Sequence, residues 1–357
     1  MTAETVTFKN VELTTDDVLK CSFSNWYSKL SKFSPQAVVI PVPKEFLQYL
    51  DNDSIRLPGD SHIDINGDNE YSDWEEEDDD GDRGHTQLDC SAIFNNENFT
   101  KFKVEVESAI NELGGSVAPK LNWSAPKDAS WINPGNSIKT NGFNDLLLLF
   151  KSSNHIVDDL QYPLSEVGAQ ENEIAVSNGQ IQYELVLKRW VDINPALEFR
   201  VFVHSKKIIG ISQRDLNHYV FLEDLRPKLR AAIEKFISTS VIDSFDLDNY
   251  IVDVHVPAPY SNVTLIDINP FSRKTDPLLF TWNELLAEKA IDESDDFEFR
   301  LVDQTNLGRF SKKEYSESQV PIDVIDAAQN TETMVELARE WNSLQIKQDL
   351  DDEEQKS

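Results

Sequence analysis

The chain has 357 residues, 33 of them basic and 64 acidic, and its formal net charge is −31 at pH 7. Because phosphate backbones are bound by a surplus of Lys and Arg, this charge argues against nucleic acid as a direct partner and is compatible with a basic protein partner. The two cysteines, Cys21 and Cys90, form no CxxC pattern, which argues against a disulfide framework and a cysteine-based zinc site. The chain has no apolar run of about 18 residues and no N-terminal signal peptide, so we expect a soluble, cytoplasmic monomer without a membrane partner.

Residues 1–56 form the predicted N-terminal region. The stretch "TDDVLKCSFSNWYSKLSKFS", residues 15–34, places aromatic and aliphatic side chains at helical spacing after an acidic start, which predicts one helix. Its apolar face, which includes Trp26, either packs against the body of the protein or binds a partner, and packing is the favoured interpretation. The following "AVVIPVP" predicts a short buried strand closed by prolines.

Residues 57–88 form a predicted acidic insert. Eleven acidic residues lie between Asp64 and Asp82, and no Lys or Arg occurs between Arg56 and Arg83. Such runs repel themselves and stay disordered, which favours a solvated, flexible insert. The alternative is an electrostatic lure for a basic surface.

Residues 89–182 form the first predicted lobe. "NFTKFKVEVESAINELGG" predicts a helix that ends at Gly114 and Gly115, because glycine adopts the left-handed conformation that terminates helices. A strand and an extended polar loop follow in "SVAPKLNWSAPKDASWI". "FNDLLLLFKSS" then predicts a strongly apolar helix.

Residues 183–291 form the second predicted lobe. "IQYELVLKRWVDI" predicts a long strand, and "LEFRVFVHSKKIIGISQRD" predicts a hairpin that turns near Ser205 to Lys207. Pro227 fits the first turn of a helix. "NYIVDVHV" and "NVTLIDIN" predict two more strands, and Thr281 with Glu284 has the spacing of a capping box. For residues 292–357 the pattern predicts an irregular segment, a C-terminal amphipathic helix and an acidic tail. Because helices and strands are mixed along the chain, the predicted fold class is α+β.

The motif "LIDINP" places Asp267 and Asn269 two residues apart at the end of an apolar strand. Residues i and i+2 of a strand share a face, so the two side chains point the same way. If the two late strands form a hairpin with Val256 opposite Thr264, Asp253 lies opposite Asp267. The three oxygen donors suit magnesium. The alternative is that one aspartate caps a turn and the other is solvated.

Basic residues accompany this carboxylate pair. The predicted hairpin brings Arg200 and Arg214 to one face near Glu198, where two guanidinium groups form either an anion clamp or an exposed Arg–Glu network. Further upstream, Lys120 follows a strand and is placed to reach phosphates as a point charge. The chain contains neither GxxxxGK[ST] nor GxGxxG, which disfavours a Walker-type NTPase and a Rossmann fold.

Seven motifs in the same order carry a family resemblance: "PKLNWSAPKDASWI", "LLLLFKSS", "YELVLKRW", "EFRVFV", "GISQRD", "LIDINPF" and "LLFTW". Together with "CSFSNWY" and the position of the acidic insert, they resemble the cell division cycle protein 123 family of eukaryotes up to about residue 285. The resemblance implies an ATP-grasp fold, in which the nucleotide lies between two lobes that have antiparallel sheets and flanking helices. It also implies an assembly factor that binds the gamma subunit of translation initiation factor 2 and promotes its joining to the alpha and beta subunits.

The resemblance further implies a set of residues that bind ATP and Mg2+. Lys120 would contact the phosphates beneath a covering loop, the strand "YELV" would meet adenine through backbone groups, and the two arginines would clamp the phosphates. The implied set is Lys120, Asn122, Ala125, Lys127, Asp128, Tyr183, Glu184, Leu185, Val186, Lys188, Arg200, Arg214, Asp253, Asp267 and Asn269. Asp253, Asp267 and Asn269 would hold magnesium.

One departure from the pattern bears on function. Many ATP-grasp ligases have Glu-x-Asn at the metal strand, whereas this chain has Asp-x-Asn at Asp267, and the sequence reveals no acceptor pocket. We therefore expect an ATP-binding assembly chaperone with no catalytic residue. The alternatives are an ATP-grasp ligase or kinase that modifies a protein, and an acidic scaffold with a vestigial nucleotide site.

Overall fold

The structure is a computed structural model, and it describes residues 13–52, 56–58, 90–165, 167, 181–287 and 297–303. The chain divides into two compact units, residues 1–307 and 308–357, and every described residue belongs to the first. Almost all of the predicted acidic insert, the predicted C-terminal helix and the acidic tail lie outside the described residues. Within the described part, no helix combines the length and the apolarity needed to cross a lipid bilayer.

The first lobe is built on a three-stranded antiparallel sheet of order β1-β3-β2. These strands are β1 (Ala37–Pro41), β3 (Glu184–Arg189) and β2 (Val117–Lys120). The lobe also contains α3 (Lys44–Asp51), α4 (Cys90–Phe94), α5 (Glu97–Glu112), α6 (Phe143–Lys151) and α7 (Asn154–Gln161). Buried side chains from α3, α5 and α6 form one apolar cluster with Ile40, Leu185 and Leu187 of the sheet. The predicted boundary at residue 183 is therefore misplaced, because β3 is the central strand of the first sheet.

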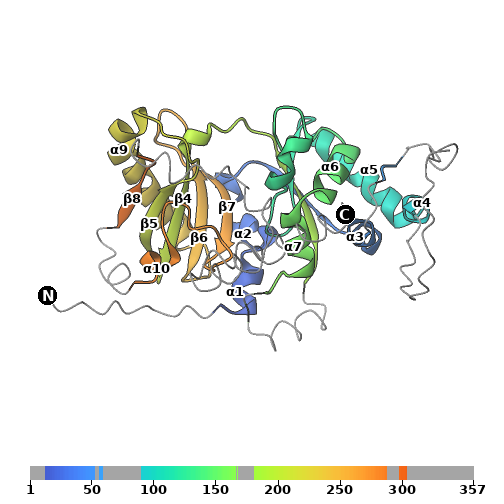
Figure 1. Ribbon diagram of the computed structural model, residues 1–357, viewed down its shortest axis with the longest axis horizontal. Coiled ribbons are helices and arrows are strands. Elements are labelled where there is room, and N and C mark those ends of the chain that lie inside the picture. Colours follow the sequence, from blue (N-terminus) through green and yellow to red (C-terminus); the bar gives the residue numbers. More distant parts are fainter. Residues whose placement is uncertain are drawn as a thin grey trace, which may run out of the picture. The chain divides into compact units, whose positions relative to one another are not determined.

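The second lobe is built on a five-stranded sheet of order β7-β6-β4-β5-β8, antiparallel except for the parallel β5–β8 pair. These strands are β7 (Thr264–Pro270), β6 (Tyr250–His255), β4 (Glu198–His204), β5 (Lys207–Gln213) and β8 (Glu298–Arg300). On one face, α9 (Phe221–Phe236) and the π-helical turn Ile237–Val241 contribute to a large apolar cluster with the sheet (Figure 1). α10 (Trp282–Leu285) belongs to a smaller apolar cluster that includes Phe202 and Ile251.

The N-terminal helical segment differs from the single predicted helix. It splits into α1 (Thr15–Lys20), α2 (Phe23–Leu30) and a 3₁₀ turn at Ser31–Phe33. The chain is held at the break because the Phe23 backbone N–H donates to the Asn122 carbonyl at 3.0 Å. The predicted packing role of this segment is confirmed, because Phe23, Trp26 and Leu30 are fully buried in the main cluster of the second lobe.

Two further sequence predictions need correction. Pro227 does not open its helix, because α9 begins six residues earlier, where Leu222 is buried and anchors an additional turn. The C-terminal stretch predicted to be irregular contains the short strand β8. The predicted capping box is confirmed, since the Thr281 side chain accepts from the Glu284 backbone and the Glu284 side chain accepts from the Thr281 backbone. The predicted end of α5 is also confirmed, because Gly114 and Gly115 have φ of +99° and +82°.

Candidate functional site

The polar face of the second sheet centres on an ion pair between β4 and β6. Arg200 and Asp253 are cross-strand neighbours. The Arg200 guanidinium donates from Nε and Nη2 to the two Asp253 carboxylate oxygens at 2.7 and 2.8 Å, and both side chains are 7% exposed. Burial is the largest single effect and by itself would raise the pKa of Asp253. The charge and hydrogen bonds of Arg200, together with the charges of Arg214 and Lys127, outweigh it and hold that pKa well below its usual range. Asp253 is therefore ionised at neutral pH.

The second arginine joins the same face, as predicted. β4 and β5 form the predicted hairpin, with Ser205 and Lys206 in the turn at φ of +50° and +59°. Arg214, directly after β5, lies 3.6 Å from the Asp253 carboxylate through Nε and 4.0 Å from that of Glu198 through Nη1. The sequence pattern thus located both arginines correctly, and they converge on one carboxylate.

A β-bulge shapes the neighbouring strand β7. Asp253 pairs with Asp267 as predicted, but Thr264 pairs with His255 and not with Val256. The difference arises because Ile266 is an extra residue without a partner on β6. Bulges interrupt the ladder and change the direction of nearby groups. Here the bulge leaves the Ile266 carbonyl outside the ladder, directly beside the predicted metal ligand Asp267.

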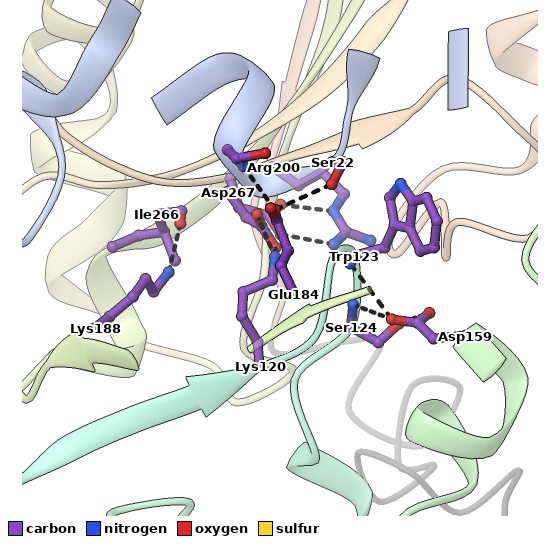
Figure 2. A network of polar contacts seen from close by, with 12 residues as sticks. Ser22, Lys120, Trp123, Ser124, Asp159, Glu184, Lys188, Arg200, Ile266 and Asp267 are labelled. Carbon is purple, nitrogen blue, oxygen red and sulfur yellow. Dashed lines mark hydrogen bonds and ion pairs between the residues drawn. The ribbon is translucent and has the colours of Figure 1, made fainter. Parts of the chain in front are cut away.

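Two lysines of the first lobe bind this bulged segment (Figure 2). The Lys120 ammonium lies 2.7 Å from each Asp267 carboxylate oxygen, and the Lys188 ammonium lies 2.7 Å from the Ile266 carbonyl oxygen. Lys120 of β2 pairs with Val186 of β3. Val186 and Lys188 are two residues apart on β3 and therefore share a face, so both lysines project from the same side of the first sheet. The predicted phosphate-binding lysine and the predicted metal ligand are therefore in direct contact.

Lys188 differs from Lys120 in the group that accepts its hydrogen bond. Burial lowers the pKa of Lys188 from 10.5 to about 8, against a smaller raising effect of the Asp267 charge. The Lys188 ammonium donates a hydrogen bond to a neutral carbonyl, whereas Lys120 has a carboxylate partner. A buried ammonium without a directly bonded carboxylate is costly, and an anionic ligand would offset that cost.

Positive charge exceeds negative charge around these residues. Among the described residues, six basic side chains and four carboxylates interact here: Lys120, Lys127, Lys188, Arg200, Arg214 and Lys274 with Asp159, Glu198, Asp253 and Asp267. This surplus is local, because the whole chain carries a net charge of −31. The site is therefore electrostatically suited to an anion with several charges.

The first residues of the loop after β2 are hydrogen-bonded to α7. The Asp159 carboxylate accepts hydrogen bonds from the Ser124 backbone N–H at 2.8 Å, from the Ser124 hydroxyl at 2.7 Å and from the Trp123 backbone N–H at 3.4 Å (Figure 2). Burial raises the pKa of Asp159, although the hydrogen bonds from Ser124 oppose the shift. The sequence interpretation missed both α7 and Asp159. The available signal was Ser153, whose side chain caps α7.

The end of the same loop is attached to the other end of α7. Asp128 accepts from the Ser153 hydroxyl at 2.6 Å and from the Asn154 backbone N–H at 2.7 Å. Its carboxylate is thus directed at the helix N-terminus, while Lys127 lies near enough to Asp253 and Lys188 to affect their pKa values. α7 therefore fixes the segment that carries Ala125 and Lys127, the predicted covering loop.

The predicted adenine-binding strand is already hydrogen-bonded within the protein. The Asn122 carboxamide donates to the Gln182 carbonyl at 2.8 Å and accepts from the Glu184 backbone N–H at 3.0 Å, and the Tyr183 carbonyl accepts from the Val42 backbone N–H at 3.0 Å. The Glu184 carboxylate accepts from the N-terminus of α2, at the Ser24 backbone N–H.

The next two residues of this strand lie in the sheet. Leu185 pairs with Ile40, and Val186 pairs with both Val39 and Lys120. Just before the strand, burial raises the pKa of Tyr183 to about 12, and the phenol donates to the Leu160 carbonyl at 3.0 Å. Asn122 thus contacts the start of this strand, which the sequence did not predict, and the contact of residues 183–186 with adenine stays a prediction.

The magnesium assignment likewise stays a prediction. Asn269 follows Asp267 on β7 and pairs with Ile251 of β6. In the described part of the chain, no group of three or more His, Cys, Asp or Glu residues is arranged to hold a metal ion. The predicted set has two aspartates and one asparagine, and both aspartates have basic partners. A surface cavity of about 540 Å³ lies elsewhere, beside α5 and Val38, and none of its lining residues belongs to the predicted site.

Comparison with known proteins places these motifs in a family context. The D123 family profile matches residues 26–328. The chain is 48% identical to a "Translation initiation factor eIF2 assembly protein" of Lodderomyces elongisporus, over 97% of this chain and 96% of that protein. It is 41% identical to "Cell division cycle protein 123" of Candida glabrata, over 98% of both. Among solved structures, Cdc123 of Schizosaccharomyces pombe is similar with a TM-score of 0.66 and 34% identity, covering 83% of this chain and all of that one.

Proposed function

Because the chain belongs to the D123 family, we propose that it is an ATP- and magnesium-binding assembly chaperone for translation initiation factor 2. In this proposal it acts as a cytoplasmic monomer, binds the gamma subunit and promotes formation of the alpha-beta-gamma heterotrimer. The names of the relatives, which call them assembly proteins for eIF2, support the choice of partner. The choice of subunit follows from the family resemblance of the motifs.

The observation that carries the nucleotide proposal is the buried and partly buried positive surplus between the two sheets. Lys188 has a neutral carbonyl as its hydrogen-bond partner, and its pKa is lowered by burial, so this position favours an added anion. Lys120, Lys188 and Arg214 would hold phosphate oxygens. The carboxylates of Asp253 and Asp267, with the Asn269 carboxamide, are hard oxygen donors that fit magnesium. When bound, magnesium would supply neutralisation of phosphate charge.

Residues from both lobes make up this set, and this suggests how ATP would influence assembly. Lys120 and Lys188 come from the first sheet, and Asp253 and Asp267 come from the second. A ligand that binds residues of both lobes favours the arrangement in which both sets face it. The surface offered to the gamma subunit would then depend on nucleotide by linkage, without catalysis.

Nucleotide binding is tested with Asp267→Asn and Asp267→Ala. The asparagine variant keeps a hydrogen-bond acceptor for Lys120 and removes the charge that magnesium requires. We expect the affinity for ATP in the presence of magnesium, measured by calorimetry, to fall about 10-fold or more in both variants. Asp246→Asn is the matched control, because Asp246 also binds a lysine, Lys29, but is 65% exposed. Unchanged ATP affinity in both Asp267 variants would overturn the site assignment.

Partner binding is tested with purified subunits. We expect the full chain to capture the gamma subunit of initiation factor 2, and the yield of heterotrimer to be higher with ATP than without it. Asp267→Asn should lose the ATP-dependent increment. Equal yields with and without the protein would contradict the assembly role.

A second candidate is an ATP-grasp ligase or kinase that modifies a protein. The convergence of Arg200 and Arg214 on the same carboxylate favours it, because such a cluster can also stabilise a transferring phosphoryl group. The two candidates differ in turnover. Release of ADP in proportion to a mass increase on the initiation factor would support the enzyme, and ATP binding without either product would support the chaperone.

A further inference from the structure

We propose that Lys120 makes metal binding at Asp267 depend on nucleotide, because its ammonium occupies the carboxylate that magnesium would need. The inference rests on the proposed function and concerns the order in which the two ligands bind. Lys120 is 2% exposed and reaches both Asp267 oxygens at 2.7 Å. It is thus a buried cation that contacts both carboxylate oxygens of the predicted metal ligand at the same distance.

Metal and ammonium compete for the same oxygens. Magnesium requires direct oxygen contacts at about 2.1 Å with near-octahedral geometry. Both Asp267 oxygens already accept from Lys120, and the other predicted carboxylate, Asp253, accepts from Arg200 at both of its oxygens. A divalent cation that arrives alone would also enter a region where basic groups outnumber carboxylates. The metal-only state is therefore disfavoured by both geometry and charge.

A phosphate group removes this competition. Its oxygens accept hydrogen bonds from Lys120, which releases the Asp267 carboxylate, and its negative charge compensates the local surplus. Metal and nucleotide are thus expected to bind with positive coupling.

The bulge in β7 lies where the two sheets are in contact, so Lys120 would move from Asp267 to phosphate at this contact. The consecutive residues Ile266 and Asp267 receive Lys188 and Lys120, respectively. Lys120, which occupies the carboxylate, and its neighbour Lys188 therefore both connect β7 to the first sheet. Asp267 is 17% exposed, so the carboxylate is accessible to solvent once the ammonium leaves it.

The inference is tested with Mn2+ alone as the probe, measured by calorimetry and electron paramagnetic resonance on the full chain without nucleotide. We expect Lys120→Met to bind Mn2+ about 10-fold more tightly than the wild type, while its affinity for ATP falls. Lys120→Gln, which keeps a neutral donor to Asp267, provides a second variant in case the methionine variant does not fold. Lys120→Arg keeps the charge and should show no gain in Mn2+ affinity.

Two comparisons identify the origin of the gain. Asp267→Asn in the Lys120→Met background should abolish it, because the released carboxylate is then absent. Lys29→Met frees Asp246 from a comparable ion pair, in which the two side chains are 44% and 65% exposed, and should leave Mn2+ affinity unchanged. If a folded Lys120→Met or Lys120→Gln variant binds Mn2+ no better than the wild type, Lys120 does not control metal binding.

This failure is distinguishable from failure of the proposed function. If the wild type binds ATP with magnesium but the Lys120 variants show no gain in Mn2+ affinity, the proposed dependence of metal binding on nucleotide is overturned. The nucleotide site then still stands. A wild type that does not bind ATP overturns the proposed function. A gain in Mn2+ affinity in that case still supports exclusion of metal by Lys120.

Discussion

The two faces of the five-stranded sheet are formed by alternate residues of the same strands, yet they serve different purposes. Phe199, Val201 and Val252 point into the main apolar cluster and are fully buried. Arg200 and Asp253, their direct neighbours in sequence, form the ion pair of the candidate site. Because a single step along a strand changes the face, stability and binding can be altered separately by substitutions one residue apart.

The apolar face should show the largest effect on stability. Phe199→Ala removes a fully buried ring that contacts Phe299 edge-on at a centroid distance of 5.3 Å. We expect the free energy of unfolding to fall by about 4 kcal/mol, because the site cannot collapse around the lost ring. Chemical denaturation measures this change. ATP affinity of the folded protein should stay the same, and a parallel loss of affinity would show that the two faces are not independent.

The polar face should show a somewhat smaller effect, with a dependence on pH. Asp253→Ala leaves the Arg200 guanidinium buried without its carboxylate, and we expect a loss of about 3 kcal/mol at pH 7. In the wild type, the pKa of Asp253 is held below its usual range, so its contribution is present above the ordinary pKa of an aspartate and is lost as pH falls through the lower, folded-state pKa.

Denaturation between pH 5 and pH 2 tests this assignment of the acid dependence. The decrease of stability in acid should be shallower in Asp253→Ala than in the wild type, whereas Phe199→Ala should retain the wild-type slope. An equal slope in Asp253→Ala and the wild type would mean that other carboxylates dominate the acid response.

Lys188 faces the polar side from the first lobe, and its removal should stabilise the protein. Its pKa of about 8 lies below the ordinary 10.5, so between these pH values the unfolded chain binds a proton that the folded protein has lost. Stability therefore rises with pH across this window, and below about pH 8 the full cost of the buried charge is present. Lys188→Met should gain about 2 kcal/mol at pH 7, after allowance for the lost hydrogen bond to Ile266.

Denaturation from pH 7 to pH 10.5 tests the Lys188 prediction. The variant should show a flatter profile than the wild type over this range, and its ATP affinity should be lower. Lys29→Met, which alters a lysine with a 44% exposed side chain, provides the control. A destabilised Lys188→Met variant at pH 7 would show that the buried ammonium does not oppose folding.

Sequence patterns predicted the parts of the site that depend on local periodicity. Alternation along β4 and β6 correctly placed Arg200 and Asp253 on the face opposite the main apolar cluster, and the hairpin correctly brought Arg214 to it. The same face also carries Phe202 and Ile251, which are buried in the smaller apolar cluster. The pairing of Asp253 with Asp267 was also correct. These features follow from the two-residue period of strands and from short connections, both of which can be read from the chain.

Features that depend on distant contacts could not be predicted. The bulge at Ile266 receives a hydrogen bond from Lys188, which is 78 residues away in the sequence, and a single extra residue leaves no mark on the apolar pattern. The attachment of Ser124 to Asp159 links two segments 35 residues apart. The break before Phe23 similarly depends on Asn122. Tertiary hydrogen bonds set these details, and local propensity carries little information about them.

The burial of α2 has a consequence for synthesis on the ribosome. Trp26 and Leu30 are made early, but their cluster also contains Ile233 of α9 and Leu265 of β7. About 240 residues separate α2 from β7, which corresponds to on the order of 10 to 50 s of translation. During that interval α2 lacks the native partners that α9 and β7 supply, although earlier members of the cluster such as Trp123 and Val186 are already made. A chain of this architecture would thus itself need protection from aggregation until its last strands emerge.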